Sequence, residues 1–255
     1  HGNPKPRLFR LAEDRAVINR FGFNNRGQED ALARLTRRDR SRGVLGVNIG
    51  ANKDATDRIA DYAEGVRRMS PVADYLTVNI SSPNTPGLRQ LQDEGALREL
   101  LAAVRDARTA GGPPVFLKVA PDLGEDEPAQ IVRAALDHGI DALIVSNTTV
   151  SRPPLRSAHA GESGGLSGAP LKPLALDALR RFRRASGGQL PLVGVGGIAT
   201  AEDAWERIRA GASLVQLYSA MVYEGPGIAR RIVAGLAHHV ERASFSSIAE
   251  AVGTE

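Results

Sequence analysis

The chain has 255 residues, 33 basic and 29 acidic side chains and a net charge of +4, with 42% hydrophobic and 24% charged residues. These values suit a globular protein with one large or two small domains. The absence of cysteine excludes disulfides, thiolate metal sites, iron–sulfur ligation and a cysteine nucleophile within this chain. Aromatic residues make up only 4%, which argues against a nucleic-acid stacking surface. No apolar run approaches the length of a membrane-spanning helix.

The predicted elements alternate between short strands and amphipathic helices. Residues 8–23 contain brief apolar runs without this alternation, so we expect an insertion lying over one end of the fold. Runs rich in Val, Ile and Leu then predict strands buried on both faces at 43–49, 75–80, 114–119, 142–145, 190–195 and 213–217. Amphipathic spacing predicts the helices between them at 56–69, 93–108, 127–138, 173–185 and 201–210, the last capped by Thr200.

Repeated strand–helix–strand units predict a parallel sheet with crossover helices. A (β/α)8 TIM barrel is favoured over an open doubly wound sheet, because the latter usually has a glycine-rich phosphate loop after its first strand and here the glycines come late. Six strands are counted where a TIM barrel needs eight. The chain begins at His1 rather than Met and opens with a loop, so we expect the first two strands to lie upstream.

Polar residues gather where the predicted strands end. One strand ends in Asn79-Ile80-Ser81-Ser82-Pro83-Asn84-Thr85, and others end near Asn48, at Lys118 and in Ser146-Asn147-Thr148-Thr149. The carboxyl ends of parallel strands meet at one edge of the sheet, where α/β barrels hold their active sites. The pattern therefore predicts a single polar pocket at that edge.

Lys118 stands out because its neighbours in Val115-Phe116-Leu117-Lys118-Val119 are apolar, and a buried lysine is unfavourable unless it is paired. Two roles remain open from the residues alone. Lys118 is either a Schiff-base lysine of the aldolase type or a cation that stabilises negative charge on a ligand or reduced cofactor.

Late glycines indicate a phosphate site, since glycine lets the backbone approach a ligand closely. Gly164-Gly165-Leu166-Ser167-Gly168, Gly196-Gly197 and Tyr218-Ser219 follow the positions where barrels often bind phosphate through backbone N–H groups. Arg20 is a candidate carboxylate clamp, with Asn19 and Asn24 beside it. His138, His238 and His239 have no metal-ligand spacing, and we interpret them as helix-end or surface residues.

Taken together, these segments resemble dihydroorotate dehydrogenases, in the order in which that family has them. The matching segments are 19–24 (NRFGFN), 46–50 (GVNIG), 79–85 (NISSPNT), 117–123 (LKVAPDL), 146–149 (SNTT), 164–168 (GGLSG), 194–198 (GVGGI) and 214–219 (LVQLYS). The resemblance runs over nearly the whole chain. It implies an FMN enzyme that oxidises dihydroorotate to orotate in pyrimidine biosynthesis.

In class 2 of that family a serine removes the C5 proton of the substrate, and Ser82 occupies the matching position. Class 1 members have a cysteine there, which this chain lacks, so the resemblance implies class 2. Class 2 passes electrons to a membrane quinone, which implies a peripheral protein on the cytoplasmic face of a bacterial cell membrane. The implied partners are dihydroorotate or orotate and the quinone, with no nucleic acid and no metal.

The resemblance also assigns roles to individual residues. It implies substrate contacts for Asn19, Arg20, Phe21, Gly22, Phe23, Asn79, Asn84, Asn147 and Thr148. It implies FMN contacts for Asn48, Asn79, Lys118, Ser146, Gly168, Gly197, Tyr218 and Ser219.

Family members have a membrane-binding helical hairpin and two strands before the point where this chain begins. We therefore expect residues 1–255 to form an FMN-binding barrel domain that is incomplete at its N-terminus, with residues 8–25 as an insertion covering the substrate site. Two other functions remain as alternatives: an aldolase that uses Lys118, and a non-catalytic barrel fragment.

Overall fold

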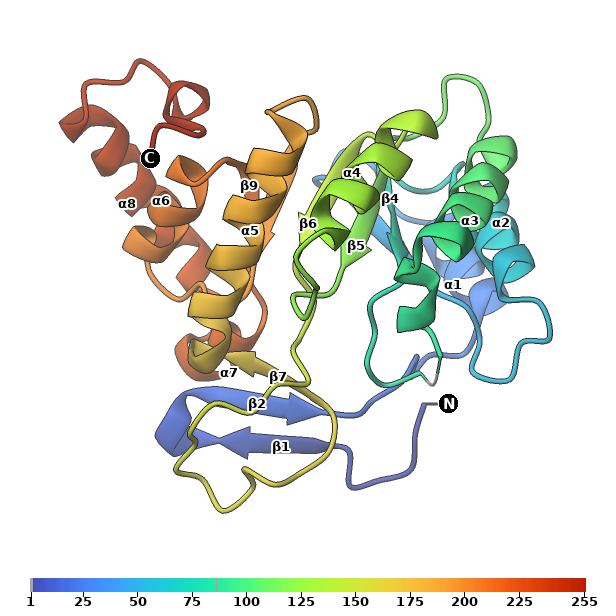
Figure 1. Cartoon of the computed structure of the whole chain (residues 1–255), viewed down its shortest axis with the longest axis horizontal. Coiled ribbons are helices and arrows are strands. Elements are labelled where there is room, and N and C mark those ends of the chain that lie inside the picture. Colours follow the sequence, from blue (N-terminus) through green and yellow to red (C-terminus); the bar gives the residue numbers. More distant parts are fainter. Residues whose placement is uncertain (1, 86) are drawn as a thin grey trace.

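The computed structural model describes residues 2–85 and 87–255, and its centre is a six-stranded parallel sheet (Figure 1). In spatial order the strands are β3 (Gly46–Ile49), β4 (Tyr75–Asn79), β5 (Val115–Val119), β6 (Ala142–Val145), β8 (Leu192–Val195) and β9 (Ala212–Gln216). Every neighbouring pair is parallel. The six strands predicted from the apolar runs are therefore confirmed.

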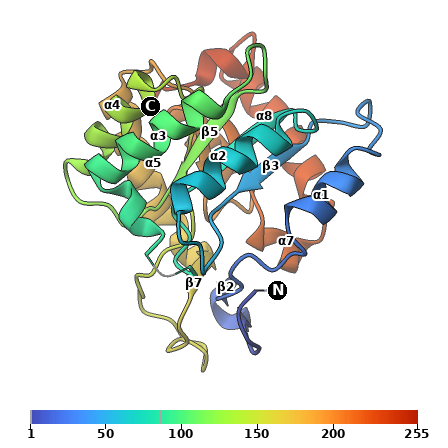
Figure 2. The ribbon, with the colours of Figure 1, turned by 90° about the vertical axis from the view of Figure 1, so that its right-hand side faces the viewer.

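Helices connect these strands and cover the sheet from outside (Figures 1 and 2). They are α1 (Gln28–Leu35), α2 (Arg58–Met69), α3 (Glu94–Ala107), α4 (Glu127–Asp137), α5 (Lys172–Ser186), α6 (Ala201–Arg209), α7 (Ser219–Glu224) and α8 (Ile228–Arg242). Single turns of 3-10 helix occur at Ala12–Asp14, Arg89–Gln92, Ala169–Leu171 and Ile248–Ala251. The five predicted helices correspond to α2 to α6, and Thr200 caps α6 through a reciprocal pair of hydrogen bonds with Asp203.

The order of the strands identifies the architecture. Consecutive strands lie side by side without a reversal, and right-handed crossovers then put the connecting helices α2 to α6 on the same face of the sheet. A doubly wound sheet would reverse its order at one point. The winding is therefore that of a TIM barrel, as predicted, although β3 and β9 do not pair with each other and the barrel is not closed within the described residues.

Alternation along the strands places apolar side chains on the outer face of the sheet and polar side chains at the carboxyl ends of its inner face. Residues such as Leu76, Val78 and Leu117 pack in the main hydrophobic core. Their neighbours Asn79 and Lys118 are partners across β4 and β5 and point to the opposite, inner face. The period of two thus sends polar side chains inward at the carboxyl ends of the strands.

The two edge strands differ from the prediction that every strand is buried on both faces. In β9 Leu214 is 59% exposed, and in β3 only Ile49 is buried. These strands have a neighbour on one side only among the described residues, whereas the central β4 and β6 are buried almost throughout. The prediction is wrong for the edges because sequence runs do not reveal which strands have two neighbours.

A second, antiparallel sheet lies across the carboxyl ends of the parallel strands (Figure 1). It contains β1 (Leu8–Leu11), β2 (Ala16–Asn19) and β7 (Gly165–Gly168), and its own small core is built from Phe9, Leu11, Ala16, Ile18 and Leu166. Residues 8–19 therefore form a hairpin, and the glycine-rich segment 165–168 pairs with β2 as the third strand of this sheet.

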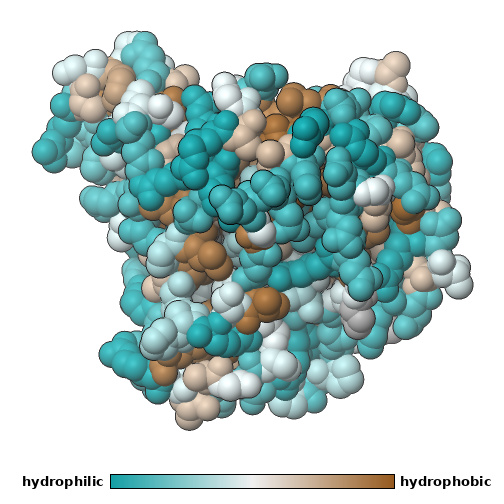
Figure 3. Space-filling view, viewed as in Figure 1, coloured by the Kyte–Doolittle hydropathy of each residue, from teal (hydrophilic) through white to brown (hydrophobic). Residues whose placement is uncertain are grey.

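The face of the molecule in Figure 3 is mainly hydrophilic, with apolar residues in small separate groups. This distribution is ordinary for helices that cover a central sheet. Among the described residues, no helix combines the length and apolar character needed to cross a bilayer.

Candidate active site

A cavity of about 430 Å³ opens at the carboxyl ends of the parallel strands, beneath the small sheet. Its walls come from β2, β5, β7 and the segments that follow β6, β8 and β9. Ten of the predicted site residues line it: Asn19, Phe21, Lys118, Ser146, Asn147, Thr148, Gly168, Gly197, Tyr218 and Ser219. The structure thus brings together residues that are separated by up to 200 positions in the sequence.

Lys118 supplies a positive charge to the wall of this cavity. Among the described residues its ammonium has no hydrogen bond or ion pair, and the desolvation caused by the surrounding protein lowers the pKa of Lys118. An unpaired cation at a cavity wall favours a ligand that carries negative charge.

A cluster of amides and a hydroxyl lies beside Lys118. The Asn79 Oδ1 accepts hydrogen bonds from the Ser81 hydroxyl at 3.1 Å and from the Asn147 Nδ2 at 3.2 Å. Ser81 also donates to the carbonyl oxygen of Lys118 at 2.9 Å. Asn79 is therefore held behind the wall, while Asn147 belongs to the wall itself.

Thr148 also lines the cavity, and its hydroxyl lies against Gly165. Its Oγ1 is buried and has no hydrogen-bond partner among the described residues. Buried polar atoms in native proteins normally have a partner, so an unpaired hydroxyl at a cavity indicates a place for a ligand atom.

Ser81 and Ser82 are adjacent in sequence but differ in their surroundings. The Ser81 side chain is fully buried and engaged in hydrogen bonds with Asn79, Asn147 and the backbone. Ser82 is half-buried, and its oxygen accepts one bond, from the Asn84 N–H at 3.3 Å. Among the described residues the Ser82 hydroxyl donates to no acceptor, which leaves its proton free for exchange.

The predicted substrate residues of segment 19–24 separate into two groups. Asn19 and Phe21 face the cavity, and the Asn84 Nδ2 donates to the Asn19 Oδ1 at 3.0 Å. Arg20 turns away: it forms an ion pair with Glu162 at 2.8 Å and donates to the carbonyl oxygen of Pro6 at 3.1 Å. These partners occupy the guanidinium that the sequence suggested as a carboxylate clamp.

Other predicted site residues also lie outside this cavity. The Phe23 ring packs directly over Gly50, and Gly22 lies against Asn3. Asn48 is exposed on the edge strand β3 and borders a separate hollow beside α1. Ser82, Asn79 and Asn84 are linked to the wall through the contacts described above but do not line the cavity themselves.

The glycine loop after β8 forms the far end of the cavity. The N–H groups of Gly197 and Ile198 donate to no oxygen within the part of the chain that the structure describes. A Cβ atom at Gly197, whose φ is +71°, would lie 2.5 Å from the Cβ of Lys172. Opposite this loop the Ser219 hydroxyl donates to the Ser167 hydroxyl at 2.7 Å. Free N–H groups on glycine backbone fit a phosphate group.

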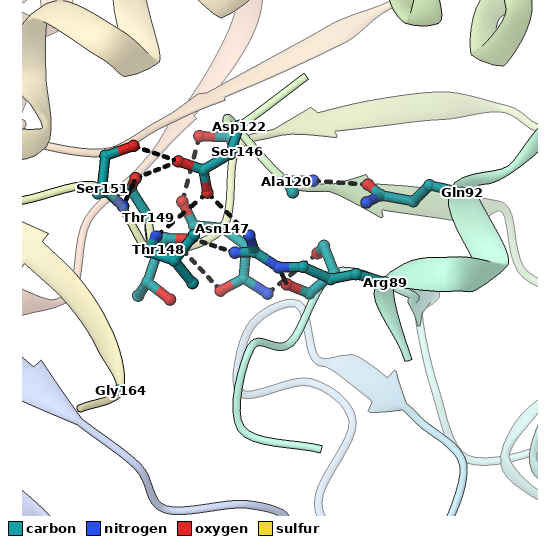
Figure 4. Close-up of polar contacts among 12 residues, drawn as sticks. Arg89, Gln92, Ala120, Asp122, Ser146, Asn147, Thr148, Thr149, Ser151 and Gly164 are labelled. Atoms are coloured by element: carbon teal, nitrogen blue, oxygen red, sulfur yellow. Dashed lines mark hydrogen bonds and ion pairs between the residues drawn. The ribbon is translucent and has the colours of Figure 1, made fainter. Parts of the chain in front are cut away.

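A partly buried ion pair that the sequence analysis did not identify supports the wall of the cavity (Figure 4). Arg89 pairs with Asp122 at 2.9 Å, and it also donates to the carbonyl oxygens of Ser81 at 3.2 Å and Thr148 at 2.9 Å. It thereby ties together the loops that follow β4, β5 and β6.

Asp122 collects further donors, from the hydroxyls of Thr149 and Ser151 and from the N–H of Val150. Burial opposes ionisation of this carboxyl, but the hydrogen bonds from Thr149 and Arg89 outweigh it and lower the pKa of Asp122. An apolar run followed by Pro121-Asp122, and an arginine ten residues after a strand, were the available signals. Neither shows that the two side chains meet.

Among the described residues no group of three or more His, Cys, Asp or Glu side chains could hold a metal ion. His138 is the residue that ends α4, and the His239 ring stacks on Trp205 at a centroid distance of 5.3 Å.

Comparison with known proteins gives a consistent result. A family model described as dihydroorotate dehydrogenase matches residues 1–240. Proteins named dihydroorotate dehydrogenase (quinone) from Novosphingobium aromaticivorans and Erythrobacter litoralis are each 67% identical to the chain, over all of it and 74% of their own length. A crystal structure of the Eimeria tenella enzyme in complex with ferulenol superimposes with a TM-score of 0.94 at 42% identity, covering 99% of this chain and 75% of that one.

Proposed function

The chain belongs to the dihydroorotate dehydrogenase family, and we propose that it oxidises dihydroorotate to orotate with FMN bound in the cavity and a membrane quinone as the final electron acceptor. The observation that carries this proposal is that one cavity holds an unpaired cation, amides with a free hydroxyl, and a glycine loop with free N–H groups. These three features match a redox ring, a small polar acid and a phosphate.

FMN fits the donors that surround the cavity. Lys118 and Ser146 would contact the ring, while Gly168, Gly197 and Ser219 would surround the phosphate. When bound, FMN would accept the hydride that leaves C6 of dihydroorotate. The desolvated ammonium of Lys118 would stabilise the negative charge that accumulates on the ring. This electrostatic stabilisation is stronger in a cavity of low dielectric than in water.

Dihydroorotate would lie on the side of Asn19, Asn147 and Thr148. The free Oγ1 of Thr148 and the amide of Asn147 would orient it. Ser82 would remove the C5 proton, and because a serine hydroxyl is a weak base, that step needs a closed pocket with little water and a path for the proton. The hairpin formed by residues 8–19 lies over this end, which supports a covering role for residues 8–25.

The proposal includes association with the cytoplasmic face of a bacterial membrane, since a membrane quinone must reach the reduced flavin. It rests on the relatives named as quinone enzymes. Sedimentation of the full-length protein with vesicles of bacterial lipids would test it.

The direct test uses the full-length protein. Purified protein should show flavin absorbance that bleaches when dihydroorotate is added without oxygen. Bound flavin that does not bleach would refute the activity. Because a lowered lysine pKa also suits Schiff-base chemistry, borohydride with a carbonyl substrate is the matching control, and a covalent adduct on Lys118 would favour the aldolase alternative.

A further inference from the structure

Arg207, on α6, is the largest of the fully buried side chains. Its Nη2 donates to the carbonyl oxygens of Lys172 and Gly196, each at 2.8 Å. Its Nε and Nη1 are buried without a partner, and within the described residues it forms no ion pair. Burial lowers the pKa of Arg207 to about 10, so at neutral pH the interior still holds a full positive charge. Such a charge is unfavourable unless it is paired, and the carboxylates of Asp203 and Glu206 attract it only from beyond ion-pair distance.

One of its acceptors belongs to the glycine loop that lines the cavity. The peptide between Gly196 and Gly197 is trans, because the cis bonds of the described chain lie elsewhere. In a trans peptide the C=O and N–H groups point in opposite directions. Since the carbonyl of Gly196 points back to Arg207, the N–H of Gly197 points away from it, on the side of the cavity that Gly197 lines.

The two bonds of Arg207 also fix the distance between two backbone segments. Lys172 begins α5 and Gly196 follows β8, and Gly197 fits against the backbone of Lys172 so closely that a Cβ would lie 2.6 Å from its Cα. The Lys172 ammonium pairs with Asp203, which in turn accepts from the N–H of Ala199 at 2.8 Å. The loop is thus held from behind, and its front is left to the cavity.

We infer that Arg207 is a positioning residue for the phosphate of the bound cofactor, which it never touches. It holds the Gly196–Gly197 peptide with its N–H toward the cavity and polarises that N–H by donating to the carbonyl at the other end. A hydrogen bond to one end of a peptide strengthens the bond made by the other end. The phosphate would in turn add a negative charge to those of Asp203 and Glu206, with which Arg207 forms no ion pair within the described residues. This inference rests on the proposed binding of FMN.

The test compares two ligands that differ only by the phosphate. FMN and riboflavin are titrated into flavin-free full-length protein, with fluorescence quenching as the readout, for the parent, Arg207→Met and Arg207→Lys. We expect Arg207→Met to weaken FMN binding at least about tenfold, on the scale of a hydrogen bond to a charged group, while riboflavin affinity changes less than about threefold. Arg207→Lys keeps the charge but not the planar guanidinium whose Nη2 reaches both carbonyls, so its FMN affinity should lie in between.

Equal losses for FMN and riboflavin would overturn the inference, because a purely structural arginine affects both ligands alike. Unchanged FMN affinity in Arg207→Met would also overturn it. If that variant does not fold, Arg207→Lys decides alone: inorganic phosphate should raise the melting temperature of the parent more than that of the lysine variant. Failure of the parent to bind FMN would instead refute the proposed function, which keeps the two results distinct.

Discussion

Replacing Arg89 by methionine should destabilise the protein by about 2–3 kcal/mol. The change removes the ion pair with Asp122 and two hydrogen bonds to the carbonyls of Ser81 and Thr148. Removing one partner of a buried pair costs about 3–5 kcal/mol, whereas an exposed pair is worth about 0–1 kcal/mol. The side chains of Arg89 and Asp122 are 23% and 16% exposed, and other donors to the carboxylate remain, so the expected loss lies between these two values.

Urea unfolding of the full-length protein measures this loss, which corresponds to a fall of about 4–12 °C in melting temperature. A double-mutant cycle with Asp122→Asn should give a coupling energy of at least about 1 kcal/mol. The control is Arg98→Met. Arg98 pairs with Asp137 at a similar 2.8 Å, but its side chain is 36% and that of Asp137 51% exposed, so its replacement should cost much less stability than that of Arg89. Additive effects in the cycle, or equal losses at Arg89 and Arg98, would refute the reasoning.

The same pair predicts a pH dependence. Although burial opposes it, hydrogen bonding lowers the pKa of Asp122 below that of an unfolded aspartate, about 3.9. Ionised Asp122 therefore stabilises the fold fully above that value, and the contribution is lost as the pH falls through the lower, folded-state pKa. The stability difference between the parent and Asp122→Asn should be constant near neutral pH and shrink below about pH 4. A difference that persists there would contradict this assignment.

Three further predictions concern the cavity. Lys118→Met should stabilise the flavin-free protein at pH 7, because it removes a desolvated amine with a lowered pKa. The gain in stability should fade toward about pH 10.4, the pKa of an unfolded lysine. A variant that is less stable than the parent in urea unfolding at pH 7 would contradict this. Ser82→Ala should slow flavin reduction by several orders of magnitude in anaerobic stopped flow without loss of bound flavin. Ser81→Ala should mainly lower the stability of the fold, by about 1–3 kcal/mol. The reverse pattern would identify Ser81 as the base. Gly197→Ala should weaken FMN binding and destabilise the fold, because the added Cβ would clash with Lys172. The control is Gly187→Ala, which also has a positive φ but no atom within 4 Å of the added Cβ, so it measures the backbone strain alone. Equal FMN affinity in the two variants would show that the clash at Gly197 does not affect FMN binding.

The parallel sheet could be predicted from sequence because its signal is local. Each strand is a short run of Val, Ile and Leu between glycine or polar residues, and the helix that connects it to the next strand covers it. The alternation in Leu117-Lys118-Val119 also places Lys118 on the face opposite the core, and the structure has it there. Period and position along a strand therefore predict the orientation of Lys118, whereas much of the cavity wall comes from the segments that follow the strands.

The small sheet could not be predicted, since its strands meet over a long distance in sequence. Residues 16–19 pair with residues 165–168, and this register depends on tertiary contacts rather than on a local pattern. The same limit explains Arg20, whose guanidinium is taken by Glu162, and Arg89, whose partner Asp122 lies on another loop. The charge of a residue can be read from sequence, but the atom that neutralises it cannot.

The cavity is held from two sides by clusters that share no residue. On the side of Thr148, Arg89 and Asp122 join three loops through an ion pair and backbone carbonyls. On the side of Gly197, Arg207 joins two segments through carbonyls alone and forms no direct ion pair within the described residues. A pair that is already neutral stabilises the fold whether or not a ligand is bound, whereas a buried cation with no direct partner gains when an anion arrives. The first cluster should therefore control stability and the orientation of the substrate, and the second should control how strongly the phosphate end of the cofactor is held.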